Sequence, residues 1–412
     1  WGPLSRAGQE RTPELGPLLL EEVKQAAHPD SALGFLADLF AHLGGEWSYD
    51  KLLAAEPMLA RRIVGLFGAS TTISAALVGH PETLDALLAF PPGTPTPEEI
   101  EQAHARPTSL AEARGEPEAF VAALRLAKRE LTVRIGFAYV SGDCSSDEFH
   151  GRLTALADAQ VQAALLYARR EAEEKYGGPE LQADLAVVAM GKYGGEELGF
   201  GSDLDLLFIY DSDGQTDGGA SGEPMTHAEY FARIAQRALR LLSQPDSEGP
   251  GYETDTRLRP NGSKGALVVS LASLVRYHLK KSAPWERQAL VRARVVAGDA
   301  ELSARVREVV TRLAYETEPV PPEELARVRA RMQHELAHER PDRFHAKLGY
   351  GTLTDVEFIV QYLQMVHGDD PRVRERNTRR ALDALRATGH LSEADADALD
   401  DALRFFRRIE QS

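Results

Sequence analysis

The chain has 412 residues, 43% of them hydrophobic, which is enough for two or three domains with packed cores. No apolar run approaches the roughly 20 residues of a membrane-spanning helix, residues 1–6 do not resemble a secretory signal, and the single cysteine, Cys144, excludes an internal disulfide, so we expect a cytoplasmic protein with no membrane contact. The net charge of −16 disfavours nucleic acid as a partner, because that affinity depends on Lys and Arg that neutralise phosphates.

Residues 1–148 are predicted to form an N-terminal helical region, because apolar residues recur there at spacings of three and four. The clearest run contains Leu33, Leu36, Phe40 and Leu43. Asp30 and Ser31 precede this run as candidate helix caps. The proline-rich segment 91–97 predicts an exposed linker, and helical patterns return over 117–135 and around 153–165.

Residues 149–300 contain short apolar runs of the kind found in buried strands. We predict strands at 185–190, 203–210, 252–258 and 265–270, and a helix at about 226–242. Residues 301–412 are again helical and strongly charged, which predicts a C-terminal helical bundle. The expected fold is therefore α+β and mostly helical, with a small mixed sheet between two helical domains.

The strand at 203–210 begins with two carboxylates, Asp203 and Asp205. Residues two apart on a strand point to the same face, so these side chains project together while Leu204 and Leu206 point into the core. Two adjacent carboxylates repel each other unless a cation lies between them, and Mg²⁺ prefers such oxygen ligands together with substrate phosphates. The pair therefore predicts a site for Mg²⁺ and a nucleoside triphosphate such as ATP.

A glycine-rich loop comes directly before these acids and predicts contact with the triphosphate, since glycines let backbone amides approach phosphate oxygens closely. The candidate nucleotide- and phosphate-binding residues of this loop are Gly191, Lys192, Gly201 and Ser202. The loop lacks the pattern G-x-x-x-x-G-K-[ST], which excludes that class of phosphate-loop NTPase.

A third acid is expected to complete the catalytic and metal-binding site, and Asp255 on the next predicted strand is the candidate. Glu253 would share its face, so periodicity alone leaves both open. Arg257, Arg259 and Lys264 follow closely and suit triphosphate or pyrophosphate oxygens. Asp203, Asp205 and Asp255 would then hold two metal ions that act on the α-phosphorus, and Asp255 could also serve as the base.

These motifs resemble the polymerase-β-type nucleotidyltransferase pattern, and in particular the bifunctional glutamine synthetase adenylyltransferase/adenylyl-removing enzyme family. The resemblance is carried by four segments, 191–208, 255–265, 285–294 and 354–358. That family has a removing half followed by a transferring half, and segments 202–206, 261–265 and 285–294 are more similar to the transferring half.

The resemblance implies transfer of AMP from ATP to a tyrosine of glutamine synthetase, with the PII signalling protein and glutamine as regulators of nitrogen metabolism. It also implies that the chain is part of a longer protein whose C-terminal bundle continues past residue 412. One departure is the loop Gly349–Thr352, where the family usually has Gly-Arg-Gly-Gly or Gly-Glu-Gly-Gly.

Three alternatives remain. The first is phosphorolytic removal of AMP, which would use the same fold and metal site. The second is a nucleotidyltransferase acting on RNA, disfavoured by the acidity of the chain. The third is a catalytically silent module that senses glutamine or PII, disfavoured by the intact pair of aspartates. Beside the main site, Trp285 lies on a predicted helix that extends to Arg294, and we expect its ring to be in the protein core rather than to stack on a base. Glu286 and Arg292 either line the nucleotide site, as the resemblance implies, or form a buried ion pair, and Asp355 is a candidate to reach the site from the C-terminal helices.

Overall fold

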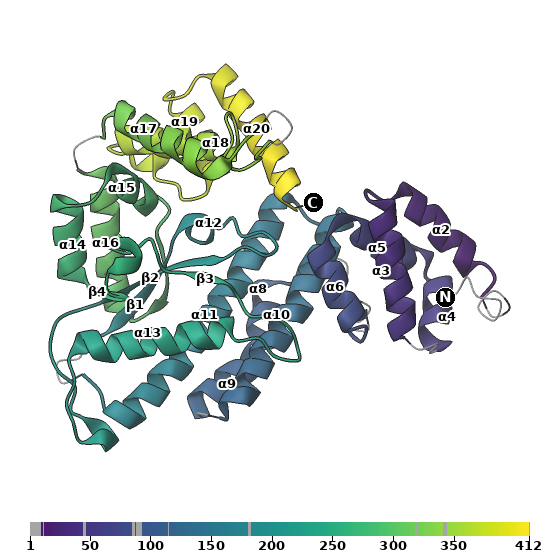
Figure 1. Cartoon of the computed structure of the whole chain (residues 1–412), viewed down its shortest axis with the longest axis horizontal. Helices are drawn as coiled ribbons and strands as arrows, with labels where there is room; N and C mark the ends of the chain where they lie inside the picture. The colour runs from purple at the N-terminus through teal and green to yellow at the C-terminus, as the bar shows by residue number, and fades with distance from the viewer. Residues whose placement is uncertain are drawn as a thin grey trace.

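The structure is a computed structural model that describes residues 10, 12–43, 47–84, 87, 93–113, 115–179, 183–317, 320–340 and 344–411. Most of these residues are helical, and one five-stranded sheet lies near the middle of the chain, which confirms the mostly helical α+β prediction. In Figure 1 the first helices lie on the right, the sheet and its covering helices lie in the centre and left, and the last helices lie at the top.

The first group of helices packs around one apolar core. It comprises α2 (Leu15–Gln25), α3 (Pro29–His42), α4 (Trp47–Ala55), α5 (Pro57–Ala69) and α6 (Thr71–Gly79). The predicted helix at 33–43 is confirmed as α3, but the predicted caps Asp30 and Ser31 are wrong. Pro29 begins the helix and His28 is its N-cap, because the fixed φ of proline suits the first helical turn.

Longer helices connect this group to the sheet. They are α8 (Pro97–Ala103), α9 (Ala105–Ala113), α10 (Pro117–Val140) and α11 (Ser146–Tyr176). Residues 91 and 92 of the predicted linker lie outside the described residues, and Pro97 already begins α8. In α11 a capping box formed by Ser145 and Glu148 fixes the first turn. A domain boundary between residues 148 and 149 would fall inside α11, so the division 1–148, 149–300 and 301–412 stays a prediction.

The sheet combines antiparallel and parallel pairs. Its strands are β1 (Leu185–Ala189), β2 (Leu204–Tyr210), β3 (Thr254–Asp255), β4 (Val268–Ser270) and β5 (Arg294–Gly298). The central strand β1 pairs antiparallel with β2 and β5, while β3 and β4 both pair parallel with β2. All four predicted strands are present, although β3 and β4 are shorter than expected.

The fifth strand corrects the prediction that Arg294 continues the helix of Trp285. That helix, α15 (Pro284–Leu290), ends earlier, and Arg294 begins β5. Its guanidinium forms an ion pair of 2.7 Å with Asp158 on α11, and the apolar residues after it pair with β1. The short run Val295–Ala297 has the same apolar character as the other strands, because it too is sandwiched between helices.

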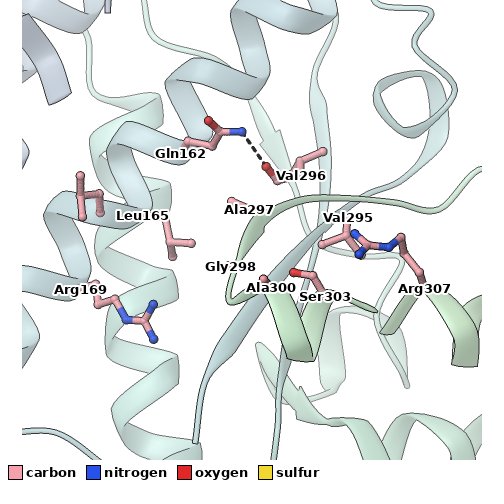
Figure 2. A pocket seen from close by; sticks show the side chains of 11 residues that line it. Gln162, Leu165, Arg169, Val295, Val296, Ala297, Gly298, Ala300, Ser303 and Arg307 are labelled. Atoms are coloured by element: carbon pink, nitrogen blue, oxygen red, sulfur yellow. Dashed lines mark hydrogen bonds between the residues drawn. The ribbon is translucent and has the colours of Figure 1, made fainter. Parts of the chain in front are cut away.

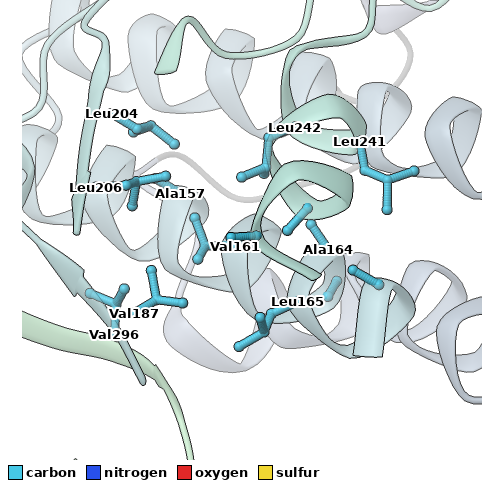
Figure 3. Close-up of a cluster of buried hydrophobic side chains, with 14 of the residues drawn as sticks. Ala157, Val161, Ala164, Leu165, Val187, Leu204, Leu206, Leu241, Leu242 and Val296 are labelled. Atoms are coloured by element: carbon cyan, nitrogen blue, oxygen red, sulfur yellow. The ribbon is translucent and has the colours of Figure 1, made fainter. Parts of the chain in front are cut away.

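Helices cover both faces of the sheet, and the alternation of side chains along the strands explains why. On one face Val187, Leu206 and Val296 pack against α11 and α13 (His227–Ser243), as Figure 3 shows. On the other face Val188 and Leu207 pack against a second set of helices. That set contains α14 (Leu271–Lys280), α15 and α16 (Ala300–Tyr315). The prediction that Leu204 and Leu206 point into the core is confirmed.

The last group has its own apolar core and returns to the sheet at its end. It contains α17 (Pro322–Met332), a π-helical turn (Gln333–Ala337), α18 (Leu353–Val366), α19 (Thr378–Ala387) and α20 (Glu393–Gln411). The final helix points back toward the glycine-rich loop and α11 (Figure 1). Among the described residues, none of the helices combines the length and apolar character required to cross a membrane.

Candidate active site

The three predicted acids lie together at one end of β2. Carboxylate oxygens of Asp203, Asp205 and Asp255 lie within 4.8 Å of one another. Asp205 and Asp255 are direct partners in the parallel pair of β2 and β3, and Asp203 immediately precedes β2. Of the two acids that periodicity left open, the structure brings Asp255 to the cluster, while the side chain of Glu253 is exposed and its carbonyl accepts the Leu204 N–H at 2.9 Å.

Negative charge in this cluster exceeds the positive charge nearby. Burial, followed by the charges of Asp203 and Asp255, raises the pKa of Asp205 to about 7. Hydrogen bonds from Arg257 lower the pKa of Asp255. The Arg257 backbone N–H and Nε both donate to this carboxylate at 2.7 Å. Among the described residues, Arg257 forms an ion pair with Asp255 in this cluster, and the charges of Lys347 and Arg257 offset the raised pKa of Asp205 only in part, so the cluster is suited to hard cations with oxygen ligands.

Gly191 is required by its contact with Asp205. It begins the short helix α12 (Gly191–Gly194) with a φ of +54°, and a Cβ built there would lie 2.2 Å from Asp205 Oδ2. Both the left-handed backbone and the lack of space exclude a side chain. Gly201 has a φ of +66° in open space, and the hydroxyl of Ser202 accepts the Gly199 N–H at 3.0 Å. The loop therefore brings backbone close to the acids, while its contact with a triphosphate stays a prediction.

The predicted phosphate-binding cations lie in different environments. Arg259 donates to Thr256 O and Thr256 Oγ1 at 2.7 Å and to Gly265 O at 3.2 Å, so it holds its own loop together. Lys264 is exposed in the turn η3 (Gly262–Lys264). Arg257 is 76% exposed beside Asp255. Phosphate binding by Arg257 and Lys264 stays a prediction, and Arg259 has a structural role in addition.

Lys192 contacts the last helix instead of open solvent. Its Nζ donates to Glu410 Oε1 at 2.7 Å and to Oε2 at 2.8 Å, and both side chains are mostly buried. The predicted phosphate contact of Lys192 would therefore compete with this ion pair.

Glu197, in the same loop, is a functional candidate that the motif reading missed. It is 4% exposed and contacts Arg292 at 2.6 Å and Arg407 at 2.7 Å. It also accepts hydrogen bonds from the backbone N–H and hydroxyl of Thr378. Burial would raise the pKa of Glu197, but the two arginines lower it to about 2. Glu197 thus connects the loop, the sheet and the C-terminal helices through one carboxylate.

Arg292 and Asp355 answer two further predictions. Arg292 is buried and forms ion pairs with Glu197 and, at 3.3 Å, with Glu357, which agrees with the ion-pair alternative for this residue. Glu286 instead accepts hydrogen bonds from the Tyr277 hydroxyl at 2.7 Å and the Ala283 N–H at 2.6 Å. A place for either residue in the nucleotide site stays a prediction.

Asp355 contacts Arg329 at 2.7 Å and caps α18, so its carboxylate has local partners and is not a member of the three-acid cluster. The loop 349–352 is tied to it, since Gly351 N–H donates to Asp355 at 2.7 Å.

A cavity of about 470 Å³ lies beside the acids, with Gly191 in its wall. Trp285 is half-buried in this wall, which corrects the prediction of a core position. A second cavity, of about 440 Å³, lies between α11 and the β5–α16 segment and is lined by Gln162 and Arg169 (Figure 2). None of the three acids lines either cavity, but Gly191, which lies against the Asp205 carboxylate, is part of the wall of the first, so of these two cavities the first is next to the acids.

A mixed sheet that holds three clustered acids after a glycine-rich loop defines the nucleotidyltransferase class of site. Residues 60–309 match the family model described as glutamate-ammonia ligase adenylyltransferase, and the chain belongs to this family. Residues 325–412 match the model described as GlnD PII-uridylyltransferase.

Similar curated proteins carry the name bifunctional glutamine synthetase adenylyltransferase/adenylyl-removing enzyme. The protein from Thioalkalivibrio sulfidiphilus is 34% identical over 98% of this chain and 43% of its own length. Those from Xanthomonas axonopodis pv. citri and Methylococcus capsulatus are 34% and 35% identical over 97% and 96% of this chain, and 42% and 44% of their own lengths. The chain therefore spans less than half the length of these relatives, and the family resemblance noted in the sequence is confirmed.

Proposed function

We propose that this chain transfers AMP from ATP to a tyrosine hydroxyl of glutamine synthetase, with release of pyrophosphate. The observation that carries the proposal is the cluster of Asp203, Asp205 and Asp255, whose oxygens lie within 4.8 Å of one another beside a glycine-rich loop. The family match and the names of the relatives support the same reaction. In this role the chain regulates nitrogen metabolism.

The carboxylates fit divalent cations, and we assign two Mg²⁺ ions to Asp203, Asp205 and Asp255 because their charge is only partly balanced by protein cations. Such ions lower the pKa of an attacking hydroxyl and offset the charge that develops on a departing pyrophosphate.

The protein groups position the reactants. The tyrosine oxygen forms a bond to the α-phosphorus, the bond from that phosphorus to the bridging oxygen of pyrophosphate breaks, and the hydroxyl proton leaves to solvent. Gly191 keeps the space beside Asp205 free, and the exposed side chains of Arg257 and Lys264 are available to the triphosphate. Because Arg257 already donates to both oxygens of Asp255, that carboxylate is better suited to hold a cation than to act as the base.

Partners and location follow from the proposed reaction. Glutamine synthetase is the protein substrate, and ATP the nucleotide. The match of residues 325–412 to a PII-uridylyltransferase model supports the PII signalling protein as a partner, and glutamine is proposed as an effector from the sequence resemblance. We place the activity in the cytoplasm, with neither nucleic acid nor membrane as a partner.

Phosphorolytic removal of AMP is the second candidate, because the names of the relatives contain both activities. The sequence segments around Asp203, Asn261 and Trp285 resemble the transferring half and favour addition.

The test combines the purified chain, Mg²⁺, ATP labelled at the α-phosphate and unmodified glutamine synthetase. We expect one adenylyl group on a tyrosine, with an equal amount of pyrophosphate released, and no labelling by the Asp203→Asn variant. Faster transfer is expected toward mild alkalinity, since the ordinary tyrosine pKa is about 10. Release of ADP from modified glutamine synthetase and phosphate, without any addition, would instead establish removal.

A further inference from the structure

The cavity beside the acids has the size and position of a small-molecule site. Its volume of about 470 Å³ lies within the range of roughly 300–1,000 Å³ that is usual for such sites. Helices α15, α17 and α18 form most of its wall, and Gly191 forms the part next to the acids. Because Gly191 is packed against the Asp205 carboxylate, a molecule in this cavity lies next to the acidic cluster.

Most of the wall is apolar and includes two aromatic rings. The apolar side chains are those of Leu258, Trp285, Ala289, Val328, Met332 and Phe358. A planar heterocycle fits such a wall, because it offers large flat surfaces to aromatic and thioether groups.

The polar part of the wall consists of the charged side chains of Arg292, Arg331 and Glu357 and of two amide side chains. Gln288 is 2% exposed, and its Nε2 donates to Gln361 Oε1 at 2.9 Å. The Oε1 of Gln288 is buried and has no hydrogen-bond partner among the described residues. A buried acceptor without a donor is unfavourable, so this oxygen is matched to a donor on a ligand. The acceptor of Gln361 is used by Gln288, which leaves its Nε2 as a donor in the same wall.

We propose that this cavity binds the adenine of ATP and that Gln288 and Gln361 select adenine over guanine. The inference rests on the proposed function, since it names how that site recognises its nucleotide. Adenine presents an amino donor next to a ring-nitrogen acceptor, which complements the Gln288 acceptor and the Gln361 donor. Guanine would place its O6 acceptor against the Gln288 oxygen, leaving two acceptors face to face. Trp285 and the neighbouring apolar side chains contact the ring faces.

The experiment measures equilibrium binding of ATP, GTP and tripolyphosphate, each with Mg²⁺, to the full chain and its variants. The wild type should bind ATP about 10-fold to 100-fold more tightly than GTP. Gln288→Leu should weaken ATP binding by about 10-fold or more and remove most of this preference, while tripolyphosphate binding stays unchanged. Gln361 is less buried than Gln288, so Gln361→Leu serves as the second variant if Gln288→Leu fails to fold, and it should weaken ATP binding in the same way. The matched control is Gln162→Leu in the second cavity, where Gln162 donates to Val296 O, and it should bind all three ligands normally.

Trp285 gives an independent readout. Its fluorescence should change when ATP binds, and Trp285→Phe should lose that change. Equal affinity for ATP and GTP in the wild type, or unchanged ATP binding in both glutamine variants, would overturn the adenine assignment. Selective ATP binding without modification of glutamine synthetase would contradict the proposed function and support the adenine assignment. Adenylylation of glutamine synthetase by a chain that binds ATP and GTP equally well would support the proposed function and overturn the adenine assignment.

Discussion

Two acidic sites include neighbouring segments of the chain: Glu197 with its partners Arg292 and Arg407 (the Glu197 group), and the cluster of Asp203, Asp205 and Asp255. They differ in how far protein cations balance their negative charge. Glu197 is surrounded by Arg292 and Arg407, which overcome the effect of burial and lower its pKa to about 2. Asp205 lies beside Asp203 and Asp255, and burial together with these charges raises its pKa to about 7. An acid whose charge is fully matched by protein cations stabilises the fold, whereas acids without that match are available to cations that arrive with a substrate.

The largest effect that tests this comparison is the loss of transfer in Asp205→Asn. We expect activity to fall by about 1,000-fold or more, because cation binding supplies much of the barrier reduction in this chemistry. The metal-free protein should keep its melting temperature, since the substitution removes one of several repelling charges. Activity is measured by labelled AMP transfer and stability by thermal unfolding without metal.

Asp211 at the far end of β2 is the matched control. It forms an ion pair of 2.7 Å with Arg305, and Asp211→Asn should keep full activity and change stability by less than about 1 kcal/mol. More than a few per cent of activity in Asp205→Asn would show that the acids are not cation ligands. Chelation of divalent metal from the wild type should reproduce the loss.

Glu197→Gln should have the opposite profile, with a large effect on stability. Removing one charge from a buried group of ions takes this partner from Arg407 and leaves Arg292 with Glu357, at a cost of about 3–5 kcal/mol in the free energy of unfolding. The neighbouring Glu196→Gln is the control, because Glu196 is partly exposed and contacts only Arg380 among the ion pairs of the described residues. The free energies of unfolding of both variants are measured with denaturant at neutral pH. Equal values for the two would contradict the stabilising role of Glu197.

The pH dependence of this difference has a defined sign. The pKa of Glu197 falls from an ordinary 4.5 to about 2 in the folded protein, so its stabilising effect is present above pH 4.5 and is lost as the pH falls toward 2. This effect amounts to about 3 kcal/mol. The unfolding free energies of wild type and Glu197→Gln should therefore converge as the pH is lowered from 5 to 3. A constant difference over that range would contradict the assignment.

The sequence predicted the acid cluster better than the Glu197 group because the two depend on different distances along the chain. Asp203 and Asp205 are two residues apart, and the period of a strand is enough to place them on one face. Asp255 joins them through one parallel pair of short strands, so its choice over Glu253 needed the register. Gly191 could also be predicted, because it belongs to the glycine-rich loop that precedes the acids in the sequence.

The partners of Glu197 could not be predicted in this way. Thr378 and Arg407 lie in helices that contact the loop only after the chain has folded, and no local period connects them to it. The same limit applies to β5, whose apolar run follows a short helix closely enough to look like its continuation. Sequence motifs therefore predicted the acid cluster, but they did not predict the buried contacts between elements that are far apart in the sequence.

A smaller effect is expected from the arginine that pairs with the acid cluster. Arg257→Ala should reduce turnover or ATP binding by about 10-fold, because the exposed guanidinium lies beside the acids and is available to phosphate oxygens. Lys264→Ala should act in the same direction, and neither should change metal-free stability noticeably. Arg372→Ala is a close control, since Arg372 contacts Asp370 through the same backbone and guanidinium bonds but far from the acids in the chain. Unchanged kinetics in Arg257→Ala would make its pair with Asp255 an ordinary surface contact.

The smallest effect concerns Lys192, which follows Gly191 in the glycine-rich loop. Its ammonium is held by Glu410 at 2.7 Å, so a role in phosphate binding requires that this ion pair opens. Glu410→Gln should weaken the hold on Lys192 and tighten binding of ATP by about 2-fold to 5-fold, because one charged partner is replaced by a neutral one. Glu393→Gln in the same helix, where Glu393 contacts Arg386, should leave the affinity unchanged. The gain must disappear when Lys192→Ala is combined with Glu410→Gln. If Glu410→Gln instead weakens ATP binding, Lys192 serves with the Glu197 group to dock the last helix, and the phosphate site lies with Arg257 and Lys264 alone.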